Sequence, residues 1–254
     1  MSALCGRVAL VTGAGQGIGA ATARRLGAAG ALVAVNDLNA DLARETARQV
    51  NTAGGKAVAV PGDVASPADV ESFTGQAESV FGPVEVLVNN AAILSMAPFA
   101  QFDPDEFDRI VNVNLTGPML CARRALPAMR AARWGRIVSV TSIWGIVGAR
   151  GATPYSAAKG GLIGFTRALA DEVADDGVIV TAIAPGVVDT PQLAADAAFA
   201  GCSLAGIRQR YADDTLVKRI AAADEIAGLI VWLAADETAA FSGQTVAVTG
   251  GRSE

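Results

Sequence analysis

The sequence predicts a single α/β domain with a doubly wound parallel sheet of about seven strands and helices on both faces. Short apolar runs alternate with longer helical segments along the whole chain, which is typical of repeated strand–helix units. A glycine-rich turn joins the first apolar run to the first helical segment. The chain has 254 residues, of which 52% are hydrophobic, and this is enough for one large core. We therefore treat residues 1–254 as one domain.

The alternation defines the expected elements in order. The predicted strands are 7–12, 31–36, 56–60, 84–88, 137–141, 178–183 and 241–248. The predicted helices are 20–29, 40–53, 68–81, 105–131, 157–173 and 224–235. Glycines at 54 and 55 and the Gly-Pro step at 82 and 83 end two of these helices. Residues 191–216 are Ala-rich and weakly patterned.

The composition excludes several kinds of site. The chain contains no histidine, so a Ser-His-Asp or Cys-His nucleophile, a His-ligated zinc site and a histidine acid/base are all impossible. We expect no metal site, and proton transfer must use Tyr, Lys or carboxylates. The formal net charge is −5, and no basic cluster indicates a nucleic-acid partner.

Membrane insertion and export are not expected either. No apolar run approaches the length of about 18 residues that a membrane helix needs. The N-terminus has no signal-peptide segment and enters a strand almost at once, so we expect a cytoplasmic protein. The three cysteines, Cys5, Cys121 and Cys202, form no C-x-x-C motif, and we expect them to be buried thiols.

The glycine-rich turn is a candidate phosphate-binding loop. It runs Thr12-Gly-Ala-Gly-Gln-Gly-Ile-Gly19, between a predicted strand and a predicted helix. Glycines there let the backbone approach a pyrophosphate, which the N–H groups at the helix N-terminus then bind. The alternative is an ordinary tight turn. The cofactor contacts expected here are Gly13, Gln16, Gly17, Ile18 and Gly19.

Asp37 follows the second predicted strand, twenty residues after Gly17. At this place a carboxylate can accept hydrogen bonds from the adenosine ribose hydroxyls, and it would repel a 2′-phosphate. Gln16 and Leu38, the neighbours that an NADP enzyme would use, are not basic. We therefore predict NAD as the cofactor. The alternative role for Asp37 is to cap the helix that begins near residue 41.

A second candidate site follows the strand 137–141. Tyr155 and Lys159 are four residues apart at a predicted helix start, so their side chains share one face. A nearby ammonium favours a phenolate and lowers the pKa of a phenol. Ser142 stands where a strand end presents polar groups to a ligand. The alternative is a surface Tyr–Lys pair without a catalytic role.

Ser142, Tyr155 and Lys159, with the register Gly13-x-x-x-Gly17-x-Gly19, resemble the short-chain dehydrogenase/reductase (SDR) family, whose domain is a Rossmann fold. The resemblance covers essentially the whole chain. It implies that Tyr155 is the acid/base, that Lys159 lowers its pKa and holds the nicotinamide ribose, and that Ser142 hydrogen-bonds the substrate oxygen. Asn114 matches the family's fourth catalytic residue, which anchors a water that links the lysine to solvent.

The resemblance implies further cofactor contacts and a substrate lid around residues 189–218. Asp63 and Val64 match the adenine contacts, although Asp63 has an alternative role as a turn or cap residue. Asn89-Asn-Ala-Ala92 is close to the family's Asn-Asn-Ala-Gly and is partly structural there. The remaining contacts implied are Asn90, Ala91, Pro185, Gly186, Val188 and Thr190, and the residues expected to line an apolar substrate pocket are Ile93, Leu94, Trp144 and Val187.

These features predict an NAD-dependent alcohol dehydrogenase or carbonyl reductase that interconverts a secondary alcohol and a ketone. By resemblance it is a homotetramer, in which the helices that begin near 105 and 155 pair across a two-fold axis. Thr249 replaces the family's usual Asp at a subunit contact, so a dimer is the second possibility. The alternatives are a 3-oxoacyl-carrier-protein reductase that uses NADPH and a catalytically silent nucleotide-binding protein.

Overall fold

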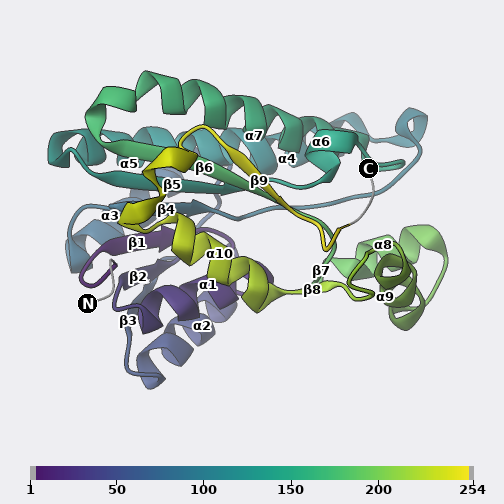
Figure 1. The fold of residues 1–254 in the computed structure, drawn as a ribbon, viewed down its shortest axis with the longest axis horizontal. Helices are drawn as coiled ribbons and strands as arrows, with labels where there is room; N and C mark the ends of the chain where they lie inside the picture. Colours follow the sequence, from purple (N-terminus) through teal and green to yellow (C-terminus); the bar gives the residue numbers. More distant parts are fainter. Residues whose placement is uncertain (1–3, 252–254) are drawn as a thin grey trace.

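The computed structural model describes residues 4–251, and within them seven parallel strands form one sheet in the order β3-β2-β1-β4-β5-β6-β9 (Figure 1). This confirms the predicted fold class. The chain moves outward from β1 to β3 and then returns to β4 beside β1. The strand order reverses at this point, and a crevice forms there at the carboxyl ends of the strands. Residues 1–3 and 252–254 of the predicted domain lie outside the described residues.

The strands are short and mostly buried on both faces, which is typical of a covered parallel sheet. They are β1 Val8–Val11, β2 Leu32–Val35, β3 Lys56–Ala59, β4 Val86–Asn89, β5 Gly135–Val140, β6 Val178–Pro185 and β9 Thr245–Val248. The last strand is shorter than the predicted 241–248, because Asp236–Phe241 forms a 3₁₀ helix, η4. A separate two-stranded pair joins β7 Val188–Asp189 to β8 Ala221–Ala222.

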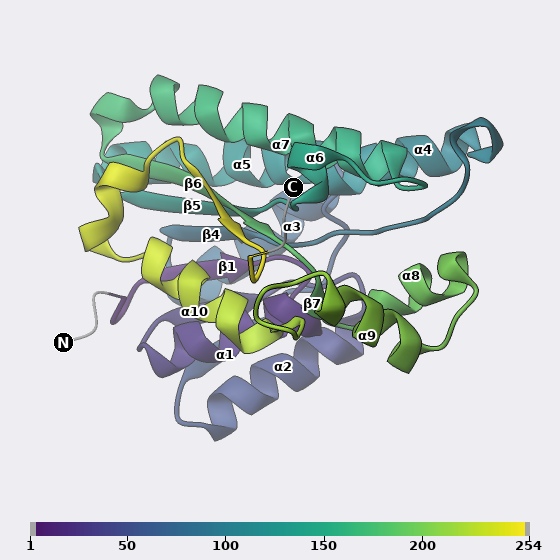
Figure 2. The same cartoon turned by 45° about the vertical axis from the view of Figure 1, so that its right-hand side comes forward.

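Helices cover both faces of the sheet (Figures 1 and 2). One layer contains α1 Gly17–Ala28, α2 Ala40–Thr52 and α10 Ala223–Leu233; the other contains α3 Pro67–Phe81, α4 Pro104–Val111, α5 Gly117–Ala132 and α7 Thr153–Glu172. Alternate residues of β1 enter two separate cores: Ala9 and Val11 pack with α1, α2 and α10, and Val8 and Leu10 pack with α3, α5 and α7. Short elements complete the chain: η1 Phe99–Gln101, α6 Trp144–Val147 and η3 Ala174–Asp176.

The predicted helix 105–131 is not regular throughout. A π-helical segment, η2 Asn112–Thr116, separates α4 from α5. Such segments occur frequently at functional sites, and this one contains Asn114. Hydrophobic spacing could not predict it, because a helix with one wider turn keeps nearly the same apolar face.

The weakly patterned segment folds into two helices, α8 Leu193–Ala200 and α9 Leu204–Asp213. They project beyond the carboxyl ends of the strands, next to the β7–β8 pair (Figure 1). They occupy most of the range 189–218 that was predicted to form a lid, and the name lid is kept for this segment below.

The prediction of three buried thiols is wrong for two of them. Cys121 is buried, whereas Cys5 and Cys202 are exposed. Cys5 lies in the turn before β1 and Cys202 in the turn between α8 and α9. Turns run over the surface of a protein, which explains both exposures.

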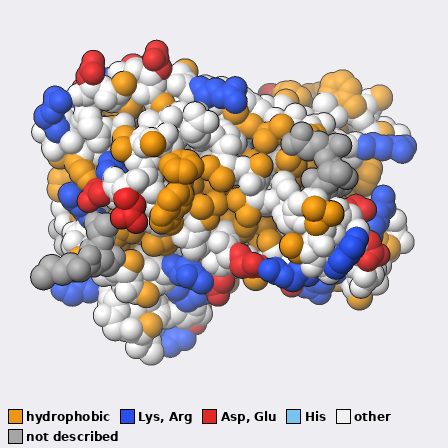
Figure 3. Space-filling view, viewed as in Figure 1, with side chains coloured by type: hydrophobic (Ala, Val, Ile, Leu, Met, Phe, Trp, Pro, Cys, Tyr) orange, Lys and Arg blue, Asp and Glu red, His pale blue; other side chains and the backbone are white. Residues whose placement is uncertain are grey.

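The face formed by α10 and β9 is rich in apolar side chains (Figure 3). Trp232 is 40% exposed, and its ring lies 5.1 Å from that of Phe241 in an edge-to-face arrangement. Among residues 4–251, no helix is both long enough and apolar enough to span a bilayer.

Candidate functional site

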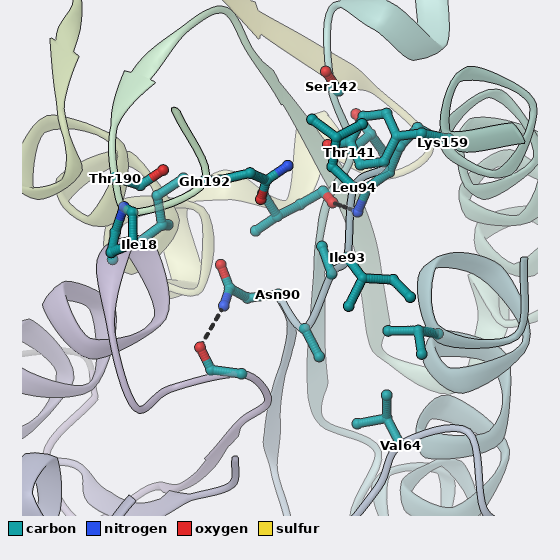
Figure 4. Close-up of a pocket in the computed structure, with 18 of the residues that line it drawn as sticks. Ile18, Val64, Asn90, Ile93, Leu94, Thr141, Ser142, Lys159, Thr190 and Gln192 are labelled. Carbon is teal, nitrogen blue, oxygen red and sulfur yellow. Dashed lines mark hydrogen bonds between the residues drawn. The ribbon is translucent and has the colours of Figure 1, made fainter. Parts of the chain in front are cut away.

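A cavity of about 640 Å³ opens at the carboxyl ends of the strands (Figure 4). It is lined by the β1–α1 turn, by the residues that follow β2, β3, β4, β5 and β6, and by the start of α8. Of the predicted site residues, the structure places the following in its wall: Gly13, Gln16, Gly17, Ile18, Asp37, Leu38, Asp63, Val64, Asn90, Ala91, Ile93, Leu94, Ser142, Trp144, Tyr155, Lys159, Pro185, Gly186, Val187, Val188 and Thr190. Gly19 and Asn114 lie behind the wall.

The glycine turn packs closely against neighbouring backbone, including that of Ala91. A Cβ on Gly13 would come within 2.6 Å of the Ala91 Cα, and one on Gly19 within 2.2 Å of the Gly13 carbonyl oxygen. The Asn90 Nδ2 donates to the carbonyls of Thr12 and Gly13, at 2.9 Å each. Gly19 is therefore needed for packing, and the sequence motif indicated the turn without separating this role from ligand contact.

The N-terminus of α1 opens toward the cavity. Its cap residue, Gln16, makes no side-chain cap hydrogen bond, and the first turn has no acidic residue. Gln16, Gly17 and Ile18 line the cavity. The first N–H groups of a helix have no partner within the helix and attract anions. Together with the glycine cradle, this end of the cavity fits the pyrophosphate of a dinucleotide.

Asp37 bonds to the glycine turn. Its Oδ2 accepts from the Gly15 N–H at 2.8 Å, and its Oδ1 accepts from the Asn39 N–H at 2.9 Å. The cap of α2 is Asn39, whose Oδ1 accepts from two N–H groups of the first turn, so the alternative role of Asp37 as that cap is wrong. Each carboxylate oxygen keeps lone pairs for another donor, so Asp37 fits a ribose diol.

Asp63 has the turn role that was considered as its alternative, and it also lies in the cavity wall. Its Oδ1 accepts from the Ala65 N–H at 2.8 Å and so closes a turn. Ser66 caps α3 through its Oγ. Asp63 and Val64 also line the cavity, and the turn therefore fixes the position of the residues predicted to contact adenine.

Ser142, Tyr155 and Lys159 meet at the other end of the cavity. Ser142 follows β5, and the other two come from the first turns of α7. The Tyr155 phenol lies near the side chains of Ser142 and Gln192, which favour its ionised form and so lower its pKa. The Lys159 ammonium donates to the Val140 carbonyl at 2.8 Å. The three predicted catalytic residues are therefore together, and Tyr155 and Lys159 are buried rather than a surface pair.

The sequence analysis predicted that Lys159 lowers the pKa of Tyr155, whereas in the structure the pKa of Tyr155 is raised. Burial raises the pKa of Tyr155 to about 12, and the groups that oppose this rise are the nearby side chains of Ser142 and Gln192. Burial also lowers the pKa of Lys159 to about 7. The prediction from spacing failed because it left out desolvation, which disfavours the charged form of each group.

Asn114 is fully buried in the π segment, behind the cavity wall. Its Nδ2 donates to the carbonyl of Ile93 at 2.8 Å and to that of Ile110 at 2.9 Å. Its Oδ1 has no hydrogen-bond partner among the described residues. Ile93 itself lines the cavity, so Asn114 holds one wall of the site through that carbonyl.

The exit of β6 closes the cavity opposite the glycine turn. The Gly186 N–H donates to the Val248 carbonyl at 2.8 Å, and a Cβ on Gly186 would come within 3.0 Å of the Thr249 Cα. Thr190 lies beside Gly17, since a Cβ there would be 3.3 Å from the Thr190 Cγ2. Thr190 is therefore beside the phosphate end of the cavity.

The substrate side has an apolar wall and a polar one. Ile93, Leu94 and Trp144 cluster with Tyr155, and the Trp144 and Tyr155 rings lie edge to face at 6.2 Å. Opposite them, Gln192 and Asp196 of the lid line the cavity. Sequence reasoning missed these two residues. The available signal was their spacing of four in an otherwise Ala-rich segment.

Within residues 4–251, no group of three or more His, Cys, Asp or Glu residues is placed to hold a metal ion.

Comparison with known proteins agrees with this geometry. A family described as short chain dehydrogenase matches residues 7–199. The short-chain reductase protein NovJ of Streptomyces niveus is 40% identical over 96% of this chain and 93% of its own. The cis-4-hydroxycyclohexanecarboxylate dehydrogenase of Sinomonas cyclohexanicum is 40% identical over 96% of each chain. A 3-oxoacyl-[acyl-carrier-protein] reductase of Synechocystis is 38% identical over 99% of this chain and 98% of its own.

Proposed function

This chain belongs to the short-chain dehydrogenase family, and from that membership we propose that it is an NAD-dependent oxidoreductase that interconverts a secondary alcohol and a ketone. The observation that carries the proposal is the Tyr155 phenol, which lies next to Ser142 in the same cavity that the glycine turn and Asp37 line. One end of the cavity fits a dinucleotide, and the other presents a proton donor beside a second hydroxyl group.

In this proposal the bound nicotinamide supplies the hydride acceptor or donor, and the protein supplies orientation and proton transfer. During reduction the Tyr155 phenol gives its proton to the developing alkoxide and becomes a phenolate; during oxidation the phenolate takes the hydroxyl proton. Because burial raises the pKa of this phenol to about 12, oxidation is favoured at high pH. Ser142 holds the substrate oxygen by a hydrogen bond. Lys159, fixed by the Val140 carbonyl, would hold the nicotinamide ribose. Asn114 keeps the Ile93 wall in place.

The preference for NAD rests on Asp37. Hydrogen bonds to a charged group contribute roughly 1.5–3 kcal/mol each, and the Asp37 carboxylate can accept them from the two ribose hydroxyls. A 2′-phosphate would face the same carboxylate. Two unit charges 4 Å apart repel by about 4 kcal/mol at an effective dielectric constant near 20. Gln16 and Leu38 provide no cation there, so we expect a preference for NAD of about 10²-fold in kcat/KM.

The test is kcat/KM for NAD and for NADP with one secondary alcohol. The Asp37→Ala/Leu38→Arg double variant should reverse the preference, because it removes the repulsion and adds a partner for the phosphate. Asp41→Ala is the matched control, since this aspartate is exposed on α2 and bonds only Arg44 through its side chain. Equal use of NAD and NADP by the wild type would refute the role of Asp37.

A second candidate is an NADPH-dependent reductase of carrier-bound 3-oxoacyl chains. It is favoured by the similarity to the Synechocystis protein of that name. The two proposals differ in cofactor and in substrate charge, so the same assay separates them: preference for NADPH together with reduction of a 3-oxoacyl thioester would make this the function.

A further inference from the structure

The lid presents two polar side chains to the substrate end of the cavity. Gln192 immediately precedes α8 in helical conformation, and Asp196 lies one turn later. Residues four apart share a helix face, and both line the cavity. Gln192 lies close enough to the Tyr155 phenol to lower its pKa, and it extends into the cavity in Figure 4. Asp196 is thus one helical turn, about 6 Å, farther along the lid from the reacting oxygen.

Asp196 is a buried carboxylate, and one of its two oxygens has no hydrogen-bond partner among the described residues. The residue is only 6% exposed. Its Oδ2 accepts from the Tyr211 hydroxyl at 3.0 Å. Its Oδ1 is buried and has no hydrogen-bond partner among the described residues. An unpaired buried acceptor is unfavourable. Since Oδ1 is closed off from the empty cavity, a ligand donor reaches it once the carboxylate turns toward the cavity that Asp196 lines, and this contact removes the cost.

We propose that Asp196 binds a second hydroxyl group of the substrate, so that the substrate is a diol or hydroxyketone whose two oxygens are separated by several bonds. This inference rests on the proposed alcohol–ketone oxidoreduction. The reacting oxygen occupies the place next to Tyr155 and Ser142, and the second hydroxyl donates to the Asp196 Oδ1. The carbon body between them packs on the apolar wall of Ile93, Leu94 and Trp144.

Charge in the cavity favours a neutral donor over an acid. The basic residues among the described cavity-lining set are Lys159 and Arg109. Lys159 donates to a backbone carbonyl at the catalytic end, and Arg109 is ion-paired with Glu106 at 2.9 Å. A substrate carboxylate near Asp196 would therefore meet a like charge without a dedicated cation.

A hydroxyl also suits either protonation state of Asp196. Burial raises the pKa of this carboxyl, and a hydroxyl can donate to the carboxylate or accept from the acid. An ammonium group would require the ionised form alone and would lie in the same cavity as Lys159. The hydroxyl is therefore the donor that fits best.

The test compares three substrates on one six-membered ring: cyclohexanol, 1,4-cyclohexanediol and 4-hydroxycyclohexanecarboxylate. The measurement is kcat/KM with NAD and with NADP, expressed as a ratio to cyclohexanol within each protein, so that changes in overall activity cancel. The wild type should prefer the diol over cyclohexanol by about tenfold or more, as expected for a hydrogen bond to a charged group. It should disfavour the acid.

Two substitutions change Asp196 in different ways. Asp196→Leu removes the acceptor, and the diol ratio should fall to about 1. Asp196→Asn removes the charge, and the ratio for the acid should rise by about tenfold, since a like charge at short range is lost. Asp213→Asn is the matched control: this aspartate is exposed on α9, bonds Gln209 and lies outside the cavity wall. It should keep the wild-type ratios.

Tyr211→Phe separates recognition from lid packing. It keeps the carboxylate and removes the bond from the Tyr211 hydroxyl to Asp196, so the preference for the diol should persist. If Tyr211→Phe abolished that preference as Asp196→Leu does, Asp196 would serve to hold the lid and the inference would be wrong. A wild-type diol ratio near 1, with clear turnover of cyclohexanol, would also overturn it. Absence of turnover of every alcohol with both cofactors would instead refute the proposed function, on which the inference rests.

Discussion

At the scale of single residues, proton transfer depends on the Tyr155 phenol. Tyr155→Phe keeps the ring and its edge-to-face contact with Trp144 but removes the hydroxyl that lies near Ser142 and Gln192. A positioned acid/base contributes about 10² to 10⁴ in rate, so kcat should fall by that factor. NADH affinity, measured by fluorescence titration, should stay near the wild-type value. A variant that kept more than about a tenth of the wild-type kcat would contradict the role.

The burial of Lys159 predicts how the free energy of unfolding changes with pH. Its pKa is about 7 in the folded protein, against an ordinary value of 10.5. Between these values the unfolded chain binds a proton that the folded protein does not, so this group's contribution to stability grows as pH rises from 7 to 10.5 and is lost as pH falls through 7. The slope is at most about 1.4 kcal/mol per pH unit.

Urea unfolding at pH 7, 8, 9 and 10 tests this, at one fixed protein concentration. The free energy of unfolding of the wild type minus that of Lys159→Met should increase with pH across this range. Lys56→Met, at an exposed position on β3, is the control, and its difference from the wild type should stay nearly constant. A constant difference for Lys159→Met as well would mean that Lys159 is charged in the fold throughout.

The functional residues that could be predicted from the sequence are those that lie at a fixed spacing within a motif or at a position where the backbone requires one residue type. Gly13, Asp37 and Ser142 follow strand ends, Tyr155 is four residues from Lys159 on α7, and the structure brings all of them to one cavity. Asp196 has no such signal, because its importance comes from burial and from an unused oxygen. The direction of the Tyr155 pKa shift was missed for the same reason, since burial is a property of the whole fold.

At the scale of elements, the β1–α1 turn should tolerate no side chain at Gly13. Its φ is +60°, and a Cβ there would lie 2.6 Å from the Ala91 backbone. Gly13→Ala should therefore lower Tm and weaken NADH binding together, because the β1–α1 turn and the loop after β4 must separate. Gly75→Ala, within α3 and with open space around its Cβ position, is the matched control. It should raise the free energy of unfolding by roughly 0.5–1 kcal/mol and leave NADH binding unchanged. Normal NADH affinity in Gly13→Ala would show that the close approach is not required.

The bounds of helices and strands were predictable where the spacing of apolar residues and the residues typical of turns indicated the same position. The bounds of α2 and α3 were predicted to within about two residues, because glycine ends each of them. The π segment, Asn112–Thr116, and the 3₁₀ helix η4 were not predicted. Both depend on tertiary contacts, such as the bonds from the Asn114 amide to Ile93 and Ile110, which local propensity does not contain.

At the scale of the whole molecule, alternation of strands and helices was sufficient for the topology. A right-handed crossover between parallel strands leaves few ways to place seven of them, and the observed order agrees with one doubly wound sheet. The quaternary structure does not follow from this alternation, because the contacts between subunits lie on surfaces that are exposed in a single chain.

We propose that the protein assembles as a tetramer through two surfaces. One is the exposed small-residue face of α7, formed by Ala157, Gly161, Gly164 and Ala168. Their spacing places them on one helix face, and small residues let a second helix approach closely. The other is the apolar face of α10 and β9 (Figure 3), where β9 is an edge strand of the sheet and Trp232 is 40% exposed.

Gly164→Arg tests the α7 surface. A side chain at Gly164 meets no atom of its own chain within 4 Å, so each subunit should still fold, whereas a charged side chain on a two-fold axis would face its own copy. Light scattering at micromolar concentration should give a tetramer for the wild type and a dimer, joined through α10 and β9, for the variant. Gly75→Arg, equally open on α3, should remain tetrameric. A monomeric wild type would contradict both surfaces, and a tetrameric Gly164→Arg would exclude α7.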